Sequence, residues 1–152
     1  MRLFVGIMSG TSLDGLDICL TRINDSSIQL LDTIFLEFPP ALRSDLLALC
    51  SPCENELVRL SVAEQEWARL AAGGIRQILQ RQQLEPTAIA AVGSHGQTIR
   101  HHPELGFSVQ IGAPALLAEL CGIPVISHFR QRDLAAGGQG APLVPAFHQW
   151  LF

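Results

Sequence analysis

Short apolar runs separated by polar turns predict three strands in the first part of the chain. Residues 3–8 and 16–23 are apolar stretches of strand length, and a turn rich in glycine, hydroxyl and carboxylate side chains separates them. Residues 28–38 follow, with apolar side chains alternating along their second half. Because two strands joined by a short Gly/Asp turn form a hairpin, the three stretches predict an antiparallel meander.

The next part of the chain has helical spacing. Pro39-Pro40 ends the third strand and begins a short helix through about residue 49. Ser61 and Glu64 have the spacing of a capping box, so we expect a longer helix to begin there. Its expected buried face carries residues three and four positions apart, namely Ala63, Trp67, Leu70, Gly74 and Ile78. We interpret Phe147, like Trp67, as a core residue.

Two further strands and one helix complete the predicted sheet. Residues 88–93 are wholly apolar, which is typical of a strand buried in a parallel sheet. Pro114 begins a helix, Gly122 follows its end, and residues 123–126 form another short strand. Three antiparallel strands followed by helix–strand units predict an α/β domain with a mixed five-stranded sheet flanked by helices.

Composition narrows the function classes. Of 152 residues, 16% are charged, against about 25% in a typical soluble domain, and no apolar run approaches the ~20 residues that span a bilayer. The net charge is −4 and there is no basic block, which argues against nucleic-acid binding. The first residues do not resemble a targeting signal, so we expect a cytoplasmic protein with its four cysteines reduced.

The first turn carries more polar groups than a hairpin requires. Across residues 10–17, glycines allow backbone N–H groups to approach an anion, and Thr11 and Ser12 add hydroxyl donors. Asp14 and Asp17 could orient a metal ion or its waters. The pattern indicates a phosphate-holding hairpin, although an ordinary Gly/Asp turn would have a similar composition.

Polar side chains also follow the fourth and fifth predicted strands. Ligands bind beyond the carboxyl ends of strands in open α/β sheets. His95, Gln97 and Thr98 occur at the first of these ends, where an imidazole, an amide and a hydroxyl suit the recognition of sugar hydroxyls. The alternative for this segment is a polar loop with a helix cap.

Arg130 and Asp133 follow the last strand and therefore reach the same edge of the sheet. Arg130 could hold a carboxylate or a phosphate in its guanidinium fork, whereas a structural Arg–Asp pair is the favoured interpretation of Asp133. Residues 137–140 are rich in glycine and allow close backbone approach or a hinge.

Two other patterns favour a structural role. Cys50 and Cys53 have the spacing of a redox motif, but Cys50 ends a helical run, where the helix does not stabilise a thiolate. His101 and His102 could ligate a metal, but no carboxylate–histidine spacing accompanies them, so we interpret them as a solvated loop.

Taken in order, the motifs resemble those of bacterial anhydro-N-acetylmuramic acid kinases along the whole chain. The resembling segments are residues 8–17, 93–98, 110–112, 129–133 and 137–145. The resemblance implies a ribonuclease-H-like lobe of the actin-like ATPase fold. It also implies that residues 1–152 form the N-terminal lobe of a sugar kinase and that the chain, ending in an interrupted helix over residues 143–152, stops before the second lobe.

The resemblance implies the following reaction: ATP, water and 1,6-anhydro-N-acetylmuramic acid give N-acetylmuramic acid 6-phosphate and ADP, a step of peptidoglycan recycling. It assigns ATP phosphates to Gly10, Thr11, Ser12, Leu13, Asp14, Gly15, Leu16 and Asp17. It assigns the sugar cleft to His95, Gln97, Thr98, Arg130 and Asp133. Magnesium would be held through water by Asp14 or Asp17.

The resemblance places the catalytic aspartate and the adenosine-binding lobe beyond Phe152, so we expect this chain alone to be inactive. Its partners would be an amino sugar, ATP and either a second lobe of the same enzyme or another copy, with no nucleic acid or membrane. The alternatives are a non-catalytic sugar- or nucleotide-binding module of the same fold and a thiol redox protein based on Cys50 and Cys53.

Overall fold

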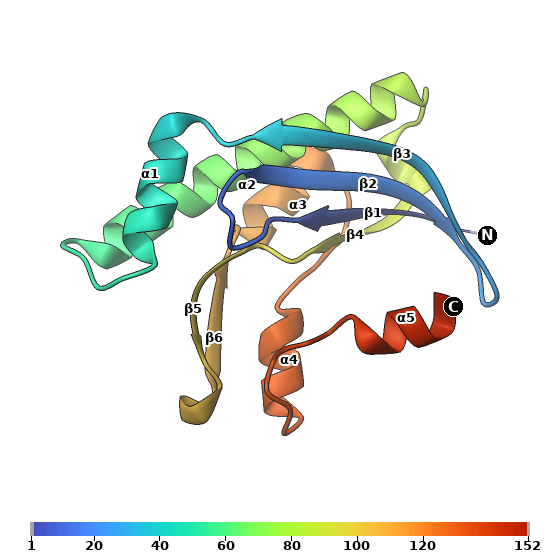
Figure 1. Ribbon diagram of the computed structural model, residues 1–152. Helices are drawn as coiled ribbons and strands as arrows, with labels where there is room; N and C mark the ends of the chain where they lie inside the picture. Colours follow the sequence, from blue (N-terminus) through green and yellow to red (C-terminus); the bar gives the residue numbers. More distant parts are fainter. Residues whose placement is uncertain (1, 152) are drawn as a thin grey trace.

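Five strands form a mixed sheet in the order β3-β2-β1-β4-β7 (Figure 1). The computed structural model describes residues 2–151. The antiparallel part comprises β1 (Arg2–Met8), β2 (Gly15–Ile23) and β3 (Ile28–Glu37). β4 (Ile89–Ser94) and the two-residue β7 (Val125–Ile126) extend it in parallel from β1. This order and these directions are those of a ribonuclease-H-like core, so the predicted fold class is confirmed, with a shorter last strand than expected.

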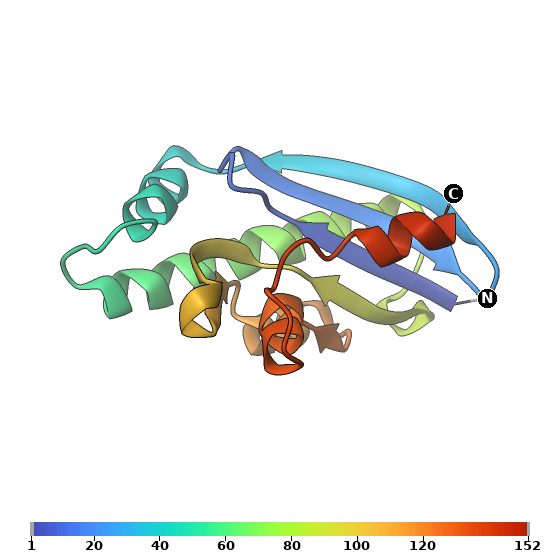
Figure 2. The same cartoon turned by 60° about the horizontal axis from the view of Figure 1, so that its bottom comes forward.

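Helices cover one face of this sheet. α2 (Glu56–Arg81) is the long central helix, and α1 (Pro40–Leu49) and α3 (Pro114–Cys121) pack against it (Figures 1 and 2). On β2 the apolar side chains that alternate toward this face, Leu16, Ile18 and Leu20, are fully buried or nearly so. Burial of apolar surface between sheet and helices is the main force that stabilises such a layer.

The long helix begins earlier than its sequence signal predicts. The expected start at Ser61 is wrong, because α2 begins at Glu56, directly after Asn55. Ser61 lies inside the helix, where its Oγ donates to the carbonyl of Leu57 at 2.8 Å, an alternative use of a serine side chain. Glu64 accepts instead from the backbone N–H of Ala113 at 3.3 Å, which ties α2 to the start of α3.

A second, two-stranded sheet was not predicted. β5 (Gln97–His102) and β6 (Phe107–Ile111) form an antiparallel hairpin through the short helix η2 (Pro103–Leu105). It projects below the main sheet in Figure 1. The interpretation of His101 and His102 as a solvated loop is therefore wrong, since both are strand residues. The strand was missed because its polar side chains hide the alternation that marks a half-buried strand.

The last part of the chain contains two short helices, α4 (Phe129–Ala135) and α5 (Pro145–Leu151). Phe147 is 44% exposed, so its interpretation as a core residue is wrong, whereas Trp67 is fully buried as predicted. Phe152, to which the expected last helix extended, lies outside the described residues. A further short helix, η1 (Pro86–Ala88), precedes β4.

Candidate functional site

The turn between β1 and β2 is held in shape by its own backbone. The N–H of Leu13 donates to the carbonyl of Gly10 at 3.3 Å, and Leu13 has the left-handed φ of 54°. Its side chain is nearly buried, and Arg43 on α1 donates from Nε to its carbonyl at 2.8 Å. Leu13 therefore anchors the turn, while Thr11 and Ser12 are exposed at its tip.

Asp14 is an oriented and exposed carboxylate. Its Oδ1 accepts from the Ser12 hydroxyl at 2.6 Å and from the backbone N–H of Gly15 at 3.1 Å. The Ser12 hydrogen bond, followed by backbone N–H groups, lowers the pKa of Asp14 from its ordinary value. Asp14 is therefore a fixed negative charge beside the tip of the turn at neutral pH.

The second half of the predicted phosphate motif has a structural function. Leu16 is fully buried, and a Cβ at Gly15 would collide with the carbonyl oxygen of Leu36 on β3. A glycine is needed there because two strands approach closely, whether or not a phosphate binds. Asp17 is exposed on the sheet face opposite the long helix, along a groove of ~350 Å³ that His95 and Phe129 also line.

The segment after β4 lies directly against this turn. Gln97 is fully buried, and its Nε2 donates to the carbonyl of Gly10 at 3.0 Å. Ser9, also buried, donates to the carbonyl of Gly96 at 3.0 Å and accepts from the indole N–H of Trp67 at 3.2 Å. The two motifs, distant in sequence, are therefore joined by buried hydrogen bonds, and α2 supports the junction through Trp67.

His95 and Arg130 form the link from β4 to α4. Arg130 donates from Nε to Nε2 of His95 at 2.9 Å and from Nη1 to the carbonyl of Gly140 at 2.6 Å. The ring of His95 also contacts the carbonyl of Gly96 through Nδ1 at 2.7 Å. Burial, and secondarily the charge of Arg130, lowers the pKa of His95, while the Gly96 contact opposes this shift.

Asp133 serves the glycine segment (residues 137–140). Its Oδ2 accepts from the N–H of Gly140 at 2.8 Å, and its backbone carbonyl accepts from the N–H of Gly138 at 2.9 Å. A Cβ at Gly138 would collide with the Asp133 carboxylate. Asp133 thus binds backbone N–H groups, in place of the Arg–Asp pair that its spacing favoured.

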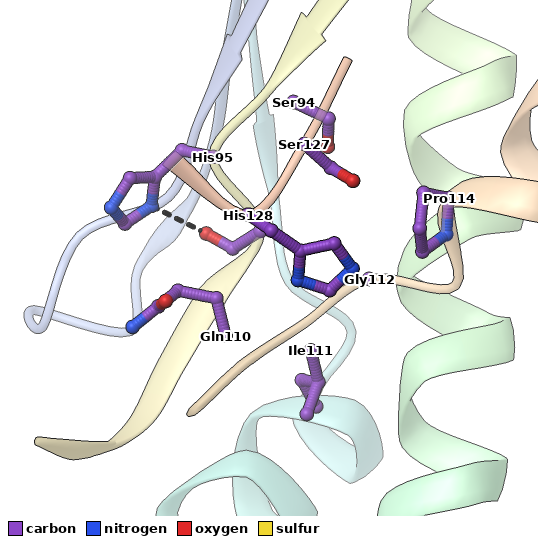
Figure 3. Close-up of a pocket in the computed structure, with 9 residues that line it drawn as sticks. Ser94, His95, Gln110, Ile111, Gly112, Pro114, Ser127 and His128 are labelled. Atoms are coloured by element: carbon purple, nitrogen blue, oxygen red, sulfur yellow. Dashed lines mark hydrogen bonds between the residues drawn. The ribbon is translucent and has the colours of Figure 1, made fainter. Parts of the chain in front are cut away.

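Two cavities lie where these elements meet. The larger, about 200 Å³, is lined by Thr11, Thr98, His101, Arg130 and Ala141, so it joins the tip of the turn to β5 and α4. The smaller, ~10 Å³, has room for about one water molecule and lies beside Ser94, His95, Gln110, Ser127 and His128 (Figure 3). We refer to the larger cavity as the turn–hairpin pocket.

His101 is the pocket residue that sequence reasoning missed. A row of hydrogen bonds on the β5–β6 hairpin holds it: His101 Nδ1 contacts the hydroxyl of Ser108 at 3.0 Å, and Ser108 accepts from Gln110 Nε2 at 2.6 Å. Gln110 also donates to the Thr98 hydroxyl at 3.2 Å. On β6 the polar residues Ser108 and Gln110 alternate, but β5 is polar at most positions and its register shifts between Thr98 and Arg100, so only the hairpin pairing brings these side chains onto one surface.

Asp14 and Asp17 are the residues that the sequence offers for magnesium. Among residues 2–151, no three His, Cys, Asp or Glu side chains gather in a group suited to hold a metal ion. Mg²⁺ commonly keeps several waters and is bound through one or two carboxylates together with substrate phosphates. The ionised, exposed carboxylate of Asp14 fits that chemistry, and Asp17 offers a second exposed carboxylate nearby on β2.

Neither cysteine of the C-x-x-C pair lies at a helix start. Cys50 follows the last residue of α1 and donates to the carbonyl of Leu46 at 3.4 Å, while Cys53 is partly buried against the core. Within the part of the chain that the structure describes, no helix has the length and apolar character needed to cross a bilayer.

Comparisons with known proteins give a consistent family. The family model described as anhydro-N-acetylmuramic acid kinase matches residues 2–152. Proteins named anhydro-N-acetylmuramic acid kinase from Pseudomonas putida and Pseudomonas fluorescens are 62% and 59% identical over the whole of this chain. One from Bordetella pertussis is 53% identical over 99% of it. The chain spans about two-fifths of the length of these relatives.

A solved structure of T. thermophilus RuvC in complex with a Holliday junction substrate is also similar, but far more distantly. It is 19% identical, covers 93% of this chain and 74% of its own, and has a TM-score of 0.39, too low to support an argument about function. The family model, by contrast, extends over all the residues that form the turn and the pocket. The chain belongs to the anhydro-N-acetylmuramic acid kinase family.

Proposed function

We propose that this chain provides the phosphate-binding turn and part of the sugar cleft of an ATP-dependent kinase for 1,6-anhydro-N-acetylmuramic acid. The observation that carries the proposal is the turn–hairpin pocket, where Thr11 from the predicted phosphate motif meets Thr98 and Arg130 from the predicted sugar motifs. A kinase needs its phosphate donor and its acceptor side by side, because phosphoryl transfer depends chiefly on positioning and electrostatic stabilisation.

In the proposed reaction, water adds to C1 of the anhydro sugar and the bond from C1 to the bridging O6 breaks. O6 takes the γ-phosphoryl group of ATP, and the water proton leaves to a base. The products are N-acetylmuramic acid 6-phosphate and ADP, so atoms and charge balance without a further reactant. The same proposal places the protein in the cytoplasm, in the recycling of peptidoglycan sugars.

On the phosphate side, the exposed tip residues Thr11 and Ser12, with Gly10, would contact the ATP phosphates. Asp14, or Asp17 farther along β2, would hold the waters of a magnesium ion, and that ion would neutralise charge on the phosphates. The internal hydrogen bonds of Asp14 keep its carboxylate ionised and oriented before any ligand arrives. Leu13, Gly15 and Leu16 would contribute only through the shape of the turn.

On the sugar side, Thr98 and Arg130 line the pocket and would contact the substrate. Arg130 uses Nε and Nη1 for contacts within the protein, so its remaining donors would face the ligand. His95, Gln97 and Asp133 all bind backbone or side-chain groups of the chain itself. Their contribution to sugar binding would be to position neighbouring residues.

The chemistry would be completed by sequence that this chain does not include. Relatives are more than twice as long, and the family resemblance assigns the catalytic aspartate and the adenosine site to the part beyond Phe152. That part, or another copy that supplies it, is the proposed partner. The competing proposal, a non-catalytic binding module of the same fold, predicts ligand binding without turnover in any such combination.

The test is to join residues 1–152 to the remaining sequence of the Pseudomonas putida relative, and to measure ADP release that depends on 1,6-anhydro-N-acetylmuramic acid. We expect the fused protein to phosphorylate the sugar and the 152-residue chain alone to be inactive. A fused protein that folds and binds ATP but shows no sugar-dependent turnover, beside an active P. putida enzyme, would refute the kinase proposal.

A further inference from the structure

His95 is bonded through both ring nitrogens, and the partners define its protonation state. Nδ1 lies 2.7 Å from the carbonyl oxygen of Gly96, which can only accept, so Nδ1 carries the proton. Nε2 lies 2.9 Å from Nε of Arg130, which can only donate, so Nε2 must be the unprotonated acceptor. The arrangement, part of which is drawn in Figure 3, therefore requires a neutral imidazole in one tautomer.

The contacts continue from His95 into the wall of the turn–hairpin pocket. Arg130 donates onward to the carbonyl of Gly140 at 2.6 Å, and Asp133 accepts from the N–H of the same residue at 2.8 Å. Gly140 is thus held at both its backbone polar groups by side chains of α4. The next residue, Ala141, lines the pocket together with Arg130.

The charged and titratable groups near the ring come from three directions. Arg130 from α4 contacts it directly, and Asp133 on the same helix reaches it only through Gly140 and Arg130. Asp17 and Cys19 from β2 line the same open groove as His95, and His128 lines the same small cavity. Among the described residues, Arg130 is thus the charge in hydrogen-bonding contact with the imidazole.

We propose that His95 is a positioning residue: its neutral imidazole, with Nε2 as acceptor, orients Arg130 and through it fixes the backbone at Gly140, next to the pocket-lining Ala141. This makes specific the general positioning role that the proposed function gives His95, by naming the atom and the partner through which it acts, and it holds for the chain without any substrate. The hydrogen-bonded connection from the end of β4 to the pocket wall passes through Nε2 of His95, so protonation of that nitrogen breaks it.

The sign of the pH dependence follows from the geometry. Protonation places an N–H opposite the N–H of Arg130 and two positive charges side by side, so the contact is lost. Burial and Arg130 already lower the pKa of His95 below its ordinary value. The contact is therefore present at neutral pH and is lost as the pH falls through the lowered pKa of this histidine.

The first experiment reads the tautomer in the ¹⁵N-labelled 152-residue chain by long-range ¹H–¹⁵N correlation of the His95 ring, without ligand. We expect a proton on Nδ1 and a bare Nε2 at neutral pH. We also expect the amide signals of Gly138 and Gly140 to shift with the same midpoint as the His95 ring during acid titration. A proton on Nε2, or glycine signals that ignore the titration of His95, would overturn the proposal.

The second experiment measures hydrogen exchange at the Gly140 amide in variants. His95→Ala should accelerate exchange by about 10-fold or more, the factor expected for losing one hydrogen bond to a charged group. His95→Gln keeps an acceptor and should retain most of the protection and lose the acid-dependent shift. Because Arg130→Gln removes the other partner, His95→Ala should add little to its effect.

The matched control is His102→Ala, since His102 is a second histidine at the far end of β5, where it contacts Glu104 and takes no part in the bonds to Arg130. It should leave the Gly140 amide unchanged. If His95→Ala leaves Gly140 exchange unchanged in a folded chain, or if its effect simply adds to that of Arg130→Gln, Arg130 does not depend on His95 and the proposal fails. None of these outcomes depends on whether the fused protein is a kinase.

Discussion

The β1–β2 turn and the network around Arg130 both contribute to one pocket, but they are built in opposite ways. The tip of the turn is shaped by bonds between residues close in sequence, such as Leu13 with Gly10 and Ser12 with Asp14, while Arg43 and Gln97 bond its backbone from outside. The network joins residues far apart, with His95, directly after β4, bonded to Arg130 on α4 at a separation of 35 positions. A locally built site tolerates changes elsewhere in the fold, whereas a site built by long-range contacts depends on each member.

The largest expected effect tests the function of the local site. In the fused enzyme, Asp14→Asn should lower kcat by about 100- to 1,000-fold, because it removes a fixed charge beside the transferred phosphoryl group while keeping the shape of the side chain. Steady-state kinetics with ATP and the anhydro sugar varied separately would measure this. Asp17→Asn is the matched comparison, and whichever aspartate loses more turnover is the one that serves the magnesium ion.

The second prediction tests the long-range site. Arg130→Gln should raise the KM for the anhydro sugar by roughly 10- to 100-fold, the loss expected for one hydrogen bond to a charged group, with a smaller change in the KM for ATP. Arg132→Gln is a suitable control, because Arg132 lies on the same helix and is exposed. A defect that fell on ATP alone would place Arg130 on the phosphate side of the pocket.

The local site was also the one that sequence reasoning described best. The strands, the turn between them and the buried face of α2 follow from apolar spacing and glycine chemistry, which act within a few residues. The β5–β6 hairpin was missed because its strands carry polar side chains whose partners are not visible in the sequence: Gln110 bonds Thr98 across the pairing and Ser108 along β6, while Arg100 pairs with Glu56 of α2. No local pattern reveals that Asp133 binds the N–H of Gly140, since the bond exists only once α4 and the glycine segment have folded together.

The start of α2 is a second case in which a local sequence pattern failed to predict the structure. Ser61 and Glu64 match a capping pattern, yet each makes a different bond, one within the helix and one to Ala113 near α3. The helix starts earlier, where Glu56 also pairs with Arg100 of β5 through atoms 2.6 Å apart. A tertiary contact therefore accompanies the observed start, and the local signal alone placed the boundary five residues too late.

The third prediction separates shape from ligand binding inside the turn itself. Gly15→Ala should lower the free energy of unfolding by about 1–3 kcal/mol, because its Cβ would meet the backbone of β3 and the strands must shift. Gly10→Ala should change it by less than about 0.5 kcal/mol, since its Cβ would make only an ordinary contact with Ser12 at 3.5 Å. Urea unfolding of the 152-residue chain measures both.

In the fused enzyme the two variants should rank the other way in their effect on the KM for ATP. Gly10→Ala should raise that KM more than Gly15→Ala does if backbone N–H groups at the tip hold phosphate. If Gly10→Ala proves as destabilising as Gly15→Ala, the two halves of the motif are not distinct, and the tip loses its special status as a ligand site.

The smallest expected effect concerns how the turn prepares its charge. Ser12→Ala removes the hydrogen bond that is the leading cause of the lowered Asp14 pKa, so that pKa should rise toward its ordinary value of 3.8. A carboxylate whose pKa is lower in the folded state stabilises the fold above its unfolded pKa, and this contribution is lost as the pH falls through the folded pKa. The unmodified chain should therefore lose slightly more stability between neutral pH and pH values below 3.8 than Ser12→Ala does. The carboxyl ¹³C shift of Asp14, followed by NMR through an acid titration, gives the pKa directly.

Thr11→Ala, a change at the neighbouring tip hydroxyl, should leave the Asp14 titration where it is. Equal titration curves for Asp14 with and without the Ser12 hydroxyl would mean that the turn does not preorganise its carboxylate, and the contrast between a self-contained turn and a dependent network would lose its clearest support.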